Sequence, residues 1–162
     1  MQIRRAVEGD AEALAEVHHR SRESAGGLIP PAVHPVEALH RFTRDVVVPH
    51  REAYLAEDHD GTALGTLVLD GDDVDWLYVA PEAQGRGVGR ALLEHAKSLR
   101  PNGLALWAFA SNHPARTFYE RHGFVAVRET DGDNEEGAPD VRYVWGGHPE
   151  ATDPATGASG HR

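Results

Sequence analysis

The sequence predicts a single α+β domain, in the mixed α/β sense, with a central mixed, mostly antiparallel sheet flanked by about four helices. Three extended segments with short turns between them occupy residues 52–80, which is the pattern of an antiparallel meander. After residue 80 the pattern changes to helix, strand, helix and two further strands. A strand–helix–strand succession implies right-handed parallel crossovers, so the sheet is expected to contain parallel pairing as well.

Length and hydropathy support one domain with one core. The chain has 162 residues, 40% of them hydrophobic, and a domain of this size buries roughly two thirds of its unfolded surface. We expect the domain to span residues 1–146, and residues 147–162, which lack an apolar face, to be a disordered tail. No run of 18 apolar residues and no charged-then-apolar leader is present, which predicts a cytoplasmic protein without a membrane partner.

Composition excludes several kinds of chemistry. The chain has no Cys, so it forms no disulfide, thiolate zinc site or covalent thiol intermediate. Its 26 acidic and 16 basic residues give a net charge of -10, which disfavours nucleic acid and favours a small cationic or neutral partner. The 11 His residues show no metal-ligand spacing, so no metal is predicted.

The first half of the chain reads as a strand, two helices and the meander. Residues 2–7 are extended in character, and a helix follows with Asp10 as its N-cap. A Gly/Pro loop at residues 26–35 separates it from a second helix that Pro49 ends. The second helix is predicted by apolar residues that recur every three or four positions, at Val36, Leu39, Phe42 and Val46.

The second half opens with the stretch YVAPEAQGRGVGRALL, residues 78–93, in which a glycine-rich turn leads into a helix. The apolar stripe of that helix consists of Val88, Leu92, Ala96 and Leu99. An apolar strand is expected at residues 104–110. The next helix, NHPARTFYERHG, has Asn112 as N-cap and Gly123 as its left-handed C-cap, and the strands FVAVRET and DVRYVWG follow.

The glycine-rich turn predicts an anion site, because it gathers backbone N–H groups and the positive end of a helix dipole at one point. Two nucleotide-binding loops fail on spacing: each requires a Gly five positions after its first one, and counted from Gly85 that position is Arg90. What remains is Gln84-x-x-Gly87-x-Gly89. A purely structural turn is the alternative. Glycines in a first helical turn each cost about 1 kcal/mol against Ala, however, and a ligand close to the backbone explains that cost.

Two motifs together resemble the GNAT superfamily of acyl-CoA N-acyltransferases. LYVAPEAQGRGVGRALL matches the family's Leu-Tyr-Val-x-Pro strand and Gln/Arg-x-x-Gly-x-Gly/Ala turn, and NHPARTFYERHGF matches its Asn-x-x-Ala-x-x-Phe-Tyr-x-x-x-Gly-Phe element. The order of elements over residues 2–145 also agrees. The resemblance implies a GNAT-type fold with the sheet splayed between its fourth and fifth strands, and acetyl-CoA as the acyl donor.

The resemblance also implies which residues bind the donor. Main-chain amides of the turn would hold the pyrophosphate of coenzyme A, and the Val79 amide would polarise the thioester carbonyl. Asn112 would contact the pantetheine arm, a role compatible with that of an N-cap. The full set of expected cofactor-binding residues is Leu77, Tyr78, Val79, Gln84, Gly85, Arg86, Gly87, Val88, Gly89, Arg90, Asn112, Ala115 and Phe118.

Direct attack of an amine on the thioester requires a base and an acid. Tyr119 matches the family's usual general acid for the leaving thiolate, the alternative being a packed core aromatic. Asp75 is the expected base, acting through water, with Asp73 second. Asp73 and Asp75 are two positions apart on a strand, so their side chains are expected to lie on the same face as those of Leu77 and Val79. An ordinary solvated strand end is the alternative for both.

The acidic stretch at residues 131–140 is expected to overhang the acceptor groove and select a cationic amine. Glu135, Glu136 and Trp107 are the expected acceptor-binding residues, and a solvated hairpin loop is the alternative reading of the stretch. The predicted activity is transfer of acetyl from acetyl-CoA to the primary amine of a small cationic molecule. A protein N-terminal or lysine acetyltransferase, and a sensor that binds acyl-CoA without turnover, remain alternatives. A homodimer is left open.

Overall fold

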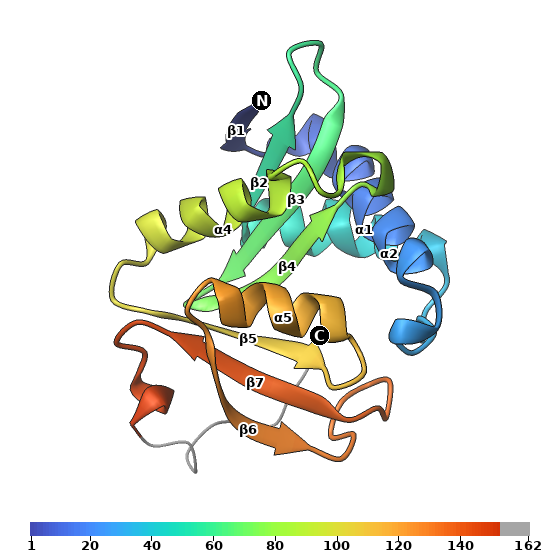
Figure 1. Ribbon diagram of the computed structural model, residues 1–162. Helices are drawn as coiled ribbons and strands as arrows, with labels where there is room; N and C mark the ends of the chain where they lie inside the picture. The colour runs from blue at the N-terminus through green and yellow to red at the C-terminus, as the bar shows by residue number, and fades with distance from the viewer. Residues whose placement is uncertain (153–162) are drawn as a thin grey trace. The chain divides into compact units, whose positions relative to one another are not determined.

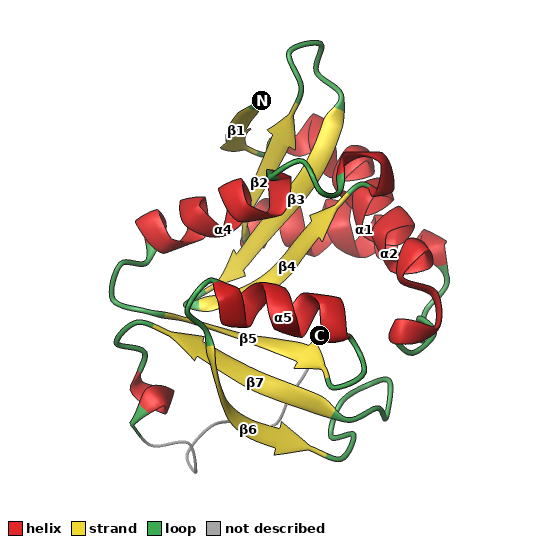
Figure 2. Ribbon diagram, in the orientation of Figure 1, coloured by secondary structure: helices red, strands yellow, loops and turns green. Residues whose placement is uncertain are grey.

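The computed structural model describes residues 1–152, which divide into two compact units (Figures 1 and 2). Unit 1 comprises residues 1–26 and 34–98, and unit 2 comprises residues 27–33 and the chain from residue 99 onward. Each unit has helices and antiparallel strand pairs, which confirms the predicted mixed α/β class. The expected splay between the fourth and fifth strands falls at the boundary of the units and stays a prediction.

Unit 1 is a four-stranded antiparallel sheet with helices on both faces. Its strands, in spatial order, are β1 (Gln2–Arg5), β2 (Glu52–Glu57), β3 (Ala63–Asp70) and β4 (Asp73–Val79). Its α and π helices are α1 (Ala11–Ala25), α2 (Val36–Phe42), the π-helix η3 (Thr43–Val47), α3 (Val48–His50) and α4 (Val88–Leu99). Short 3-10 turns are η1 (Glu8–Asp10), η2 (Gly26–Leu28), which reaches the unit boundary, and η4 (Pro81–Ala83). Within residues 1–152, no helix is long and apolar enough to cross a membrane.

The two faces of this sheet carry different helices. Figure 1 shows α1 and α2 behind the sheet and α4 in front of it. On the α1 face, Leu14, Leu55, Val68 and Trp76 belong to one buried apolar cluster. On the α4 face, the helix buries three residues of its predicted stripe, Val88, Leu92 and Ala96, together with Leu93, whereas the fourth, Leu99, is half-buried.

The position of α4 depends on a glycine in β3. A Cβ added to Gly65 would lie 2.9 Å from side-chain carbons of both Val88 and Leu92, and 3.0 Å from the Tyr78 carbonyl oxygen. Gly65 pairs with Val79 at the end of β4. The missing side chain therefore lets the first turns of α4 pack directly against the point where β4 ends.

The helical segment after residue 35 differs from its prediction. A π-helix, with hydrogen bonds five residues apart, replaces the α-helix over Thr43–Val47 and rotates the apolar face. Thr43 and Val47 are fully buried as a result, while Phe42, one of the periodic apolar residues that predict the helix, is 43% exposed. Pro49 lies inside the final helical turn, which ends one residue later at His50.

Unit 2 is a three-stranded antiparallel sheet covered by one helix. Its elements are β5 (Leu104–Phe109), α5 (His113–Arg121), β6 (Val125–Thr130), β7 (Asp140–Trp145) and η5 (Pro149–Ala151), with strand order β5-β7-β6. Tyr143 of β7 is fully buried, and its hydroxyl donates to Glu120 at 2.7 Å and accepts from Arg116 at 3.0 Å. Burial raises the pKa of this phenol.

The C-terminal tail predicted from residue 147 begins with described structure. Pro149–Ala151 forms η5, and Arg142 of β7 donates to both carboxylate oxygens of Glu150, at 3.2 and 2.8 Å. This ion pair is largely buried and anchors η5 to β7. Residues 153–162 of the predicted tail lie outside the described residues.

We predict that Gly65→Ala destabilises the protein by about 1–3 kcal/mol, because the added methyl overpacks the contact between β3 and α4. Urea unfolding measures the effect. Gly9→Ala is the matched control, since a Cβ at Gly9 meets nothing within 4 Å. Equal stability of the two variants would show that α4 does not depend on the glycine.

Candidate active site

The end of β4 presents backbone groups that β3 does not use. Ala80 N–H donates to the Leu64 carbonyl of the β3 chain at 2.8 Å. In an antiparallel pair, residues that bond to the neighbouring strand alternate with residues that do not. Tyr78 therefore directs its N–H and C=O toward β3, whereas Leu77 and Val79 direct theirs away from it. Of the three residues predicted to offer backbone contacts to a pantetheine arm, Leu77 and Val79 have the required direction.

A β-bulge changes the expected arrangement of the two aspartates. The pairing of β3 with β4 shifts between Val68 and Leu69, because Asp75 is an extra residue in β4. Side chains alternate between the faces of a strand, so the shift reverses the faces beyond the bulge. Asp73 consequently lies on the face opposite to Leu77, and the prediction that these two share a face was wrong. Asp75 lies at the bulge itself and is half-buried.

The glycine-rich turn contains two glycines with positive φ, both before the first residue of α4. Gly85 and Gly87 have φ values of +77° and +83°, in the left-handed region that favours glycine. A Cβ at either position would meet nothing within 4 Å, so conformation and not crowding requires glycine there. The first N–H groups of α4, beginning at Val88, have no partner within the helix. Arg86 and Arg90 are exposed beside them.

On the opposite face of β4, α1 contributes a buried imidazole. The His18 ring packs against Tyr78 and Trp76, with centroid distances of 4.2 and 4.5 Å. Its Nδ1 is buried and has no hydrogen-bond partner among the described residues. Burial lowers the pKa of His18 to about 3, with smaller contributions from Arg22 and His19. The imidazole is therefore neutral at pH 7.

An ion pair connects α1 to η4, just before the turn. Arg20 donates to both carboxylate oxygens of Glu82, at 3.1 and 2.5 Å. The hydrogen bonds from Arg20 lower the pKa of Glu82. Both side chains are well exposed, so the pair contributes little to stability. The pair shows that α1 lies beside the segment that leads into the turn.

In unit 2, the second motif forms a capped helix with an aromatic cluster. The Asn112 side chain accepts a hydrogen bond from the Ala115 N–H at 3.3 Å, which confirms Asn112 as the N-cap of α5. Tyr119 is half-buried, and its ring centroid lies 5.4 Å from that of Phe118 and 5.7 Å from that of Phe124. The ring of Tyr119 is thus packed against two other aromatic rings. Gly123 has the predicted left-handed φ, +89°.

The predicted acceptor residues of unit 2 occupy two separate environments. The Trp107 ring has the guanidinium of Arg128 5.2 Å from its centroid and that of Arg142 at 5.4 Å. Such contacts give the indole a packing role in the sheet. In the acidic loop, Glu135 is exposed and Glu136 is half-buried.

The acidic loop is organised from its base. Buried Asp140 accepts hydrogen bonds from the Thr130 hydroxyl and, at 3.0 Å, from the Asn134 side chain. Asn134 also donates to the Ala138 carbonyl at 2.7 Å. A loop fixed in this way holds its outer carboxylates in defined positions, which a simple solvated hairpin does not require.

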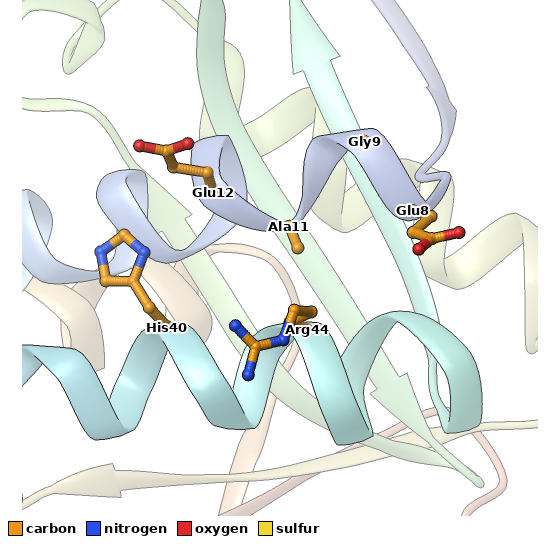
Figure 3. A pocket seen from close by; sticks show the side chains of 6 residues that line it. All are labelled: Glu8, Gly9, Ala11, Glu12, His40 and Arg44. Carbon is orange, nitrogen blue, oxygen red and sulfur yellow. The ribbon is translucent and has the colours of Figure 1, made fainter.

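A separate surface hollow of about 550 Å³ lies in unit 1 at the start of α1 (Figure 3). Figure 3 shows His40 and Arg44 rising from the α2–η3 helix toward α1. The residues that line it are Glu8, Gly9, Ala11, Glu12, His40 and Arg44. None of the residues predicted to bind a donor lines this hollow. Among residues 1–152, no group of three or more His, Asp or Glu side chains could hold a metal ion.

Comparison with known proteins agrees with this arrangement of strand, turn and helix. The model of the acetyltransferase (GNAT) domain matches residues 49–126. Peptidyl-lysine N-acetyltransferase YjaB of Escherichia coli is 30% identical over 127 residues, which cover 71% of this chain and 86% of YjaB. The chain belongs to the GNAT acetyltransferase family. It is accordingly an acyltransferase.

Further GNAT proteins resemble it in sequence or in fold. Peptidyl-lysine N-acetyltransferase YiaC of Escherichia coli is 34% identical over 93 residues, 53% of this chain, and the chain spans 63% of YiaC. The solution structure of apo YjaB has a TM-score of 0.73 at 26% identity, covering 89% of this chain and 96% of YjaB. PaiA N-acetyltransferase of Thermoplasma acidophilum, solved in complex with coenzyme A, has a TM-score of 0.68 at 19% identity, covering 90% and 98%.

Sequence reasoning missed two features of this GNAT site. His18 belongs to no motif of the sequence, because its partners in β4 lie about sixty positions along the chain. The ion pair of Arg20 with Glu82 is equally distant in sequence. Only the packing of α1 on β4 brings these residues together, and no local spacing signals it.

We predict that His18 makes folding stability depend on pH. Its pKa is lowered on folding, so the unfolded chain binds a proton here that the folded chain does not between about pH 3 and 6.5. Stability is therefore lost as pH falls through this window, by up to about 1.4 kcal/mol per pH unit.

Unfolding by urea at a series of pH values tests this, with His18→Phe expected to show a shallower loss than the wild type. His59→Phe is the control, because His59 is almost fully exposed. Retention of the wild-type slope by His18→Phe would contradict a buried neutral imidazole.

Proposed function

We propose that this GNAT enzyme transfers the acetyl group of acetyl-CoA to a primary amine. The observation that supports the donor is the end of β4, where the Val79 N–H points away from β3 and is followed by a turn with two left-handed glycines. An extended ligand can hydrogen-bond to such a strand, as a further strand would. The coenzyme A complex of PaiA, which shares the fold, agrees with this choice.

The pyrophosphate of the donor is proposed to bind at the N-terminus of α4. Gly87, Val88 and Gly89 offer backbone N–H groups at the positive end of a helix of 12 residues. Arg86 and Arg90 are exposed and add positive charge beside it. The two arginines explain a basic turn in a chain of net charge -10.

The transfer forms a C–N bond to the acetyl carbon and breaks its C–S bond. The attacking ammonium must lose one proton before it attacks, and the departing thiolate must gain one, while the nitrogen gives up another proton as the amide forms. We assign the first transfer to Asp75, acting through water, since the bulge sets this carboxylate apart from the regular strand. We assign protonation of the thiolate to Tyr119, whose ring packs against Phe118 and Phe124, and the proton that the nitrogen gives up as the amide forms restores the phenol. Asp73 is the weaker candidate base, because it lies on the other face from Leu77.

A small cationic amine is the proposed acceptor. The acidic loop supports it, since Asp140, Thr130 and Asn134 hold the loop in place while Asp131, Asp133 and Glu135 expose their carboxylates. A protein lysine is the second candidate, favoured by the named activity of YjaB and YiaC. The sequence also predicts a cytoplasmic location and no nucleic acid, membrane or metal partner. These stay predictions, and so does the oligomeric state.

We predict that Gly87→Ala weakens coenzyme A binding by at least about tenfold, because an L residue at this φ costs about 1–2 kcal/mol and displaces the turn. Gly61→Ala is the matched control. Gly61 has φ +86°, and a Cβ there would also meet nothing within 4 Å, but it lies in the β2–β3 turn.

Isothermal titration with coenzyme A measures the affinity, and urea unfolding measures the stability of each variant. Together they separate a loss of binding from a loss of stability. Both variants should lose similar stability, and only Gly87→Ala should lose affinity. Equal affinity in the two variants, or no binding to the wild type at millimolar coenzyme A, would overturn the assignment of the turn.

We predict that Tyr119→Phe lowers kcat by about 100-fold, with little change in the affinity for acetyl-CoA, because it removes the proposed proton donor. Tyr143→Phe is the control. It removes a buried hydroxyl bonded to Glu120 and Arg116, and should lower stability by about 1–3 kcal/mol instead.

Release of free thiol measures turnover over a panel of diamines, amino acids and lysine peptides. A normal rate in Tyr119→Phe would show that water protonates the thiolate. Absence of thiol release by the wild type with every amine would favour a sensor without turnover and contradict the proposed reaction.

A further inference from the structure

The peptide group that follows the Val79 N–H is held at both ends. This peptide joins Val79 to Ala80, and its N–H donates to the Leu64 carbonyl at 2.8 Å. Its carbonyl oxygen, on Val79, accepts a hydrogen bond from Nε2 of the Gln84 side chain at 3.2 Å. A peptide plane fixed by a partner on each side has little freedom to rotate. Because the dihedral angles of Val79 link this plane to the preceding peptide, a fixed plane also restricts the direction of the Val79 N–H.

The backbone between these residues forms a rigid support for the Gln84 side chain. Ala80 and Ala83 are both fully buried, and Ala83 N–H donates to the Ala80 carbonyl at 2.9 Å. Glu82, in the same 3-10 turn, is bound by Arg20 of α1. The Cα of Gln84 is therefore set by buried contacts, and its side chain returns across the turn to β4.

Gly85, the residue after Gln84, explains why no backbone N–H of this segment donates to the Val79 carbonyl. Gly85 has a left-handed φ of +77°, so the backbone turns away toward α4 directly after Gln84. The Val79 carbonyl points away from β3 and takes no bond from that strand. A long side chain with a donor at its end, placed at residue 84, supplies the missing hydrogen bond.

We propose that Gln84 is a positioning residue for acyl transfer, which holds the Val79 peptide in place through its side chain instead of contacting the donor with it. The proposal rests on the proposed function, in which the Val79 N–H polarises the thioester carbonyl. Two effects follow from the bond. It fixes the direction of the Val79 N–H, and it places a donor on a carbonyl oxygen whose negative end would otherwise lie beside developing negative charge.

Three substitutions at this position separate the hydrogen bond from the bulk of the side chain. Gln84→Glu keeps the shape but sets a carboxylate against the carbonyl oxygen, and Gln84→Met keeps the length without any donor. Gln84→Arg restores a donor of sufficient reach. Gln2→Glu is the matched control, because Gln2 is exposed in β1 and the chemical change is the same.

The expected result is a loss of kcat in Gln84→Glu by about 10- to 100-fold, the cost of small misplacement of a reacting group. KM for acetyl-CoA and the affinity for coenzyme A should change far less than kcat. Gln84→Met should lie between Gln84→Glu and the wild type, and Gln84→Arg should recover most of the activity. Gln2→Glu should match the wild type.

A readout without substrate accompanies the kinetics. The carbonyl ¹³C resonance of Val79 reports whether its oxygen accepts a hydrogen bond, and it should move to lower frequency in Gln84→Met and return in Gln84→Arg. An unmoved resonance, or a Gln84→Glu enzyme with wild-type kcat, would overturn the positioning role alone. A wild-type protein that neither binds coenzyme A nor releases thiol would instead overturn the proposed function, and this inference with it.

Discussion

The close approach of α4 to the sheet at Gly65 is the contact on which the candidate site depends. Because Gly65 has no side chain, Val88 and Leu92 lie directly over it, next to its strand partner Val79. The N-terminus of α4 is therefore held at the end of β4. The part of the candidate site proposed to bind coenzyme A depends on this contact. The left-handed glycines join β4 to α4 in the short distance that it leaves.

Both faces of β4 contribute to the same strand end. On one face α4 supplies unsatisfied N–H groups, and on the other α1 supplies His18 against Tyr78. Arg20 connects α1 to the turn through Glu82, and Gln84 connects the turn back to Val79. The segment between residues 79 and 84 thus has a fixed course although it lies between two regular elements. Unit 2 independently holds Tyr119 in an aromatic cluster and the acidic loop on a buried Asp140.

Sequence predicts the parts of this fold that depend on local spacing. The helix after the turn, three of the four residues of its apolar stripe and the cap at Asn112 each depend on residues within one or two helical turns, and each is confirmed. The face of Asp73 was predicted wrongly and the π-helix was not predicted, because a bulge and a π-helix each shift the side-chain period by one residue. Such shifts are decided by packing against distant elements, which a periodic pattern does not record.

Packing between elements distant in sequence also explains which features of the candidate site the sequence does not predict. His18 and its partners in β4 are brought together by tertiary packing alone, and no motif marks that contact. Gln84 stands in a recognised motif, yet the motif does not say whether its side chain faces the ligand or the protein. The hydrogen bond to Val79 answers that from the structure.

The most direct test of this account is a titration of ¹⁵N-labelled protein with coenzyme A, followed through the backbone amide resonances. The account predicts that the resonances of Val79, Gly87, Val88 and Gly89 shift together with one affinity, and that those of His40 and Arg44 at the surface hollow stay in place. Shifts confined to the hollow, with the end of β4 and the start of α4 unchanged, would contradict it.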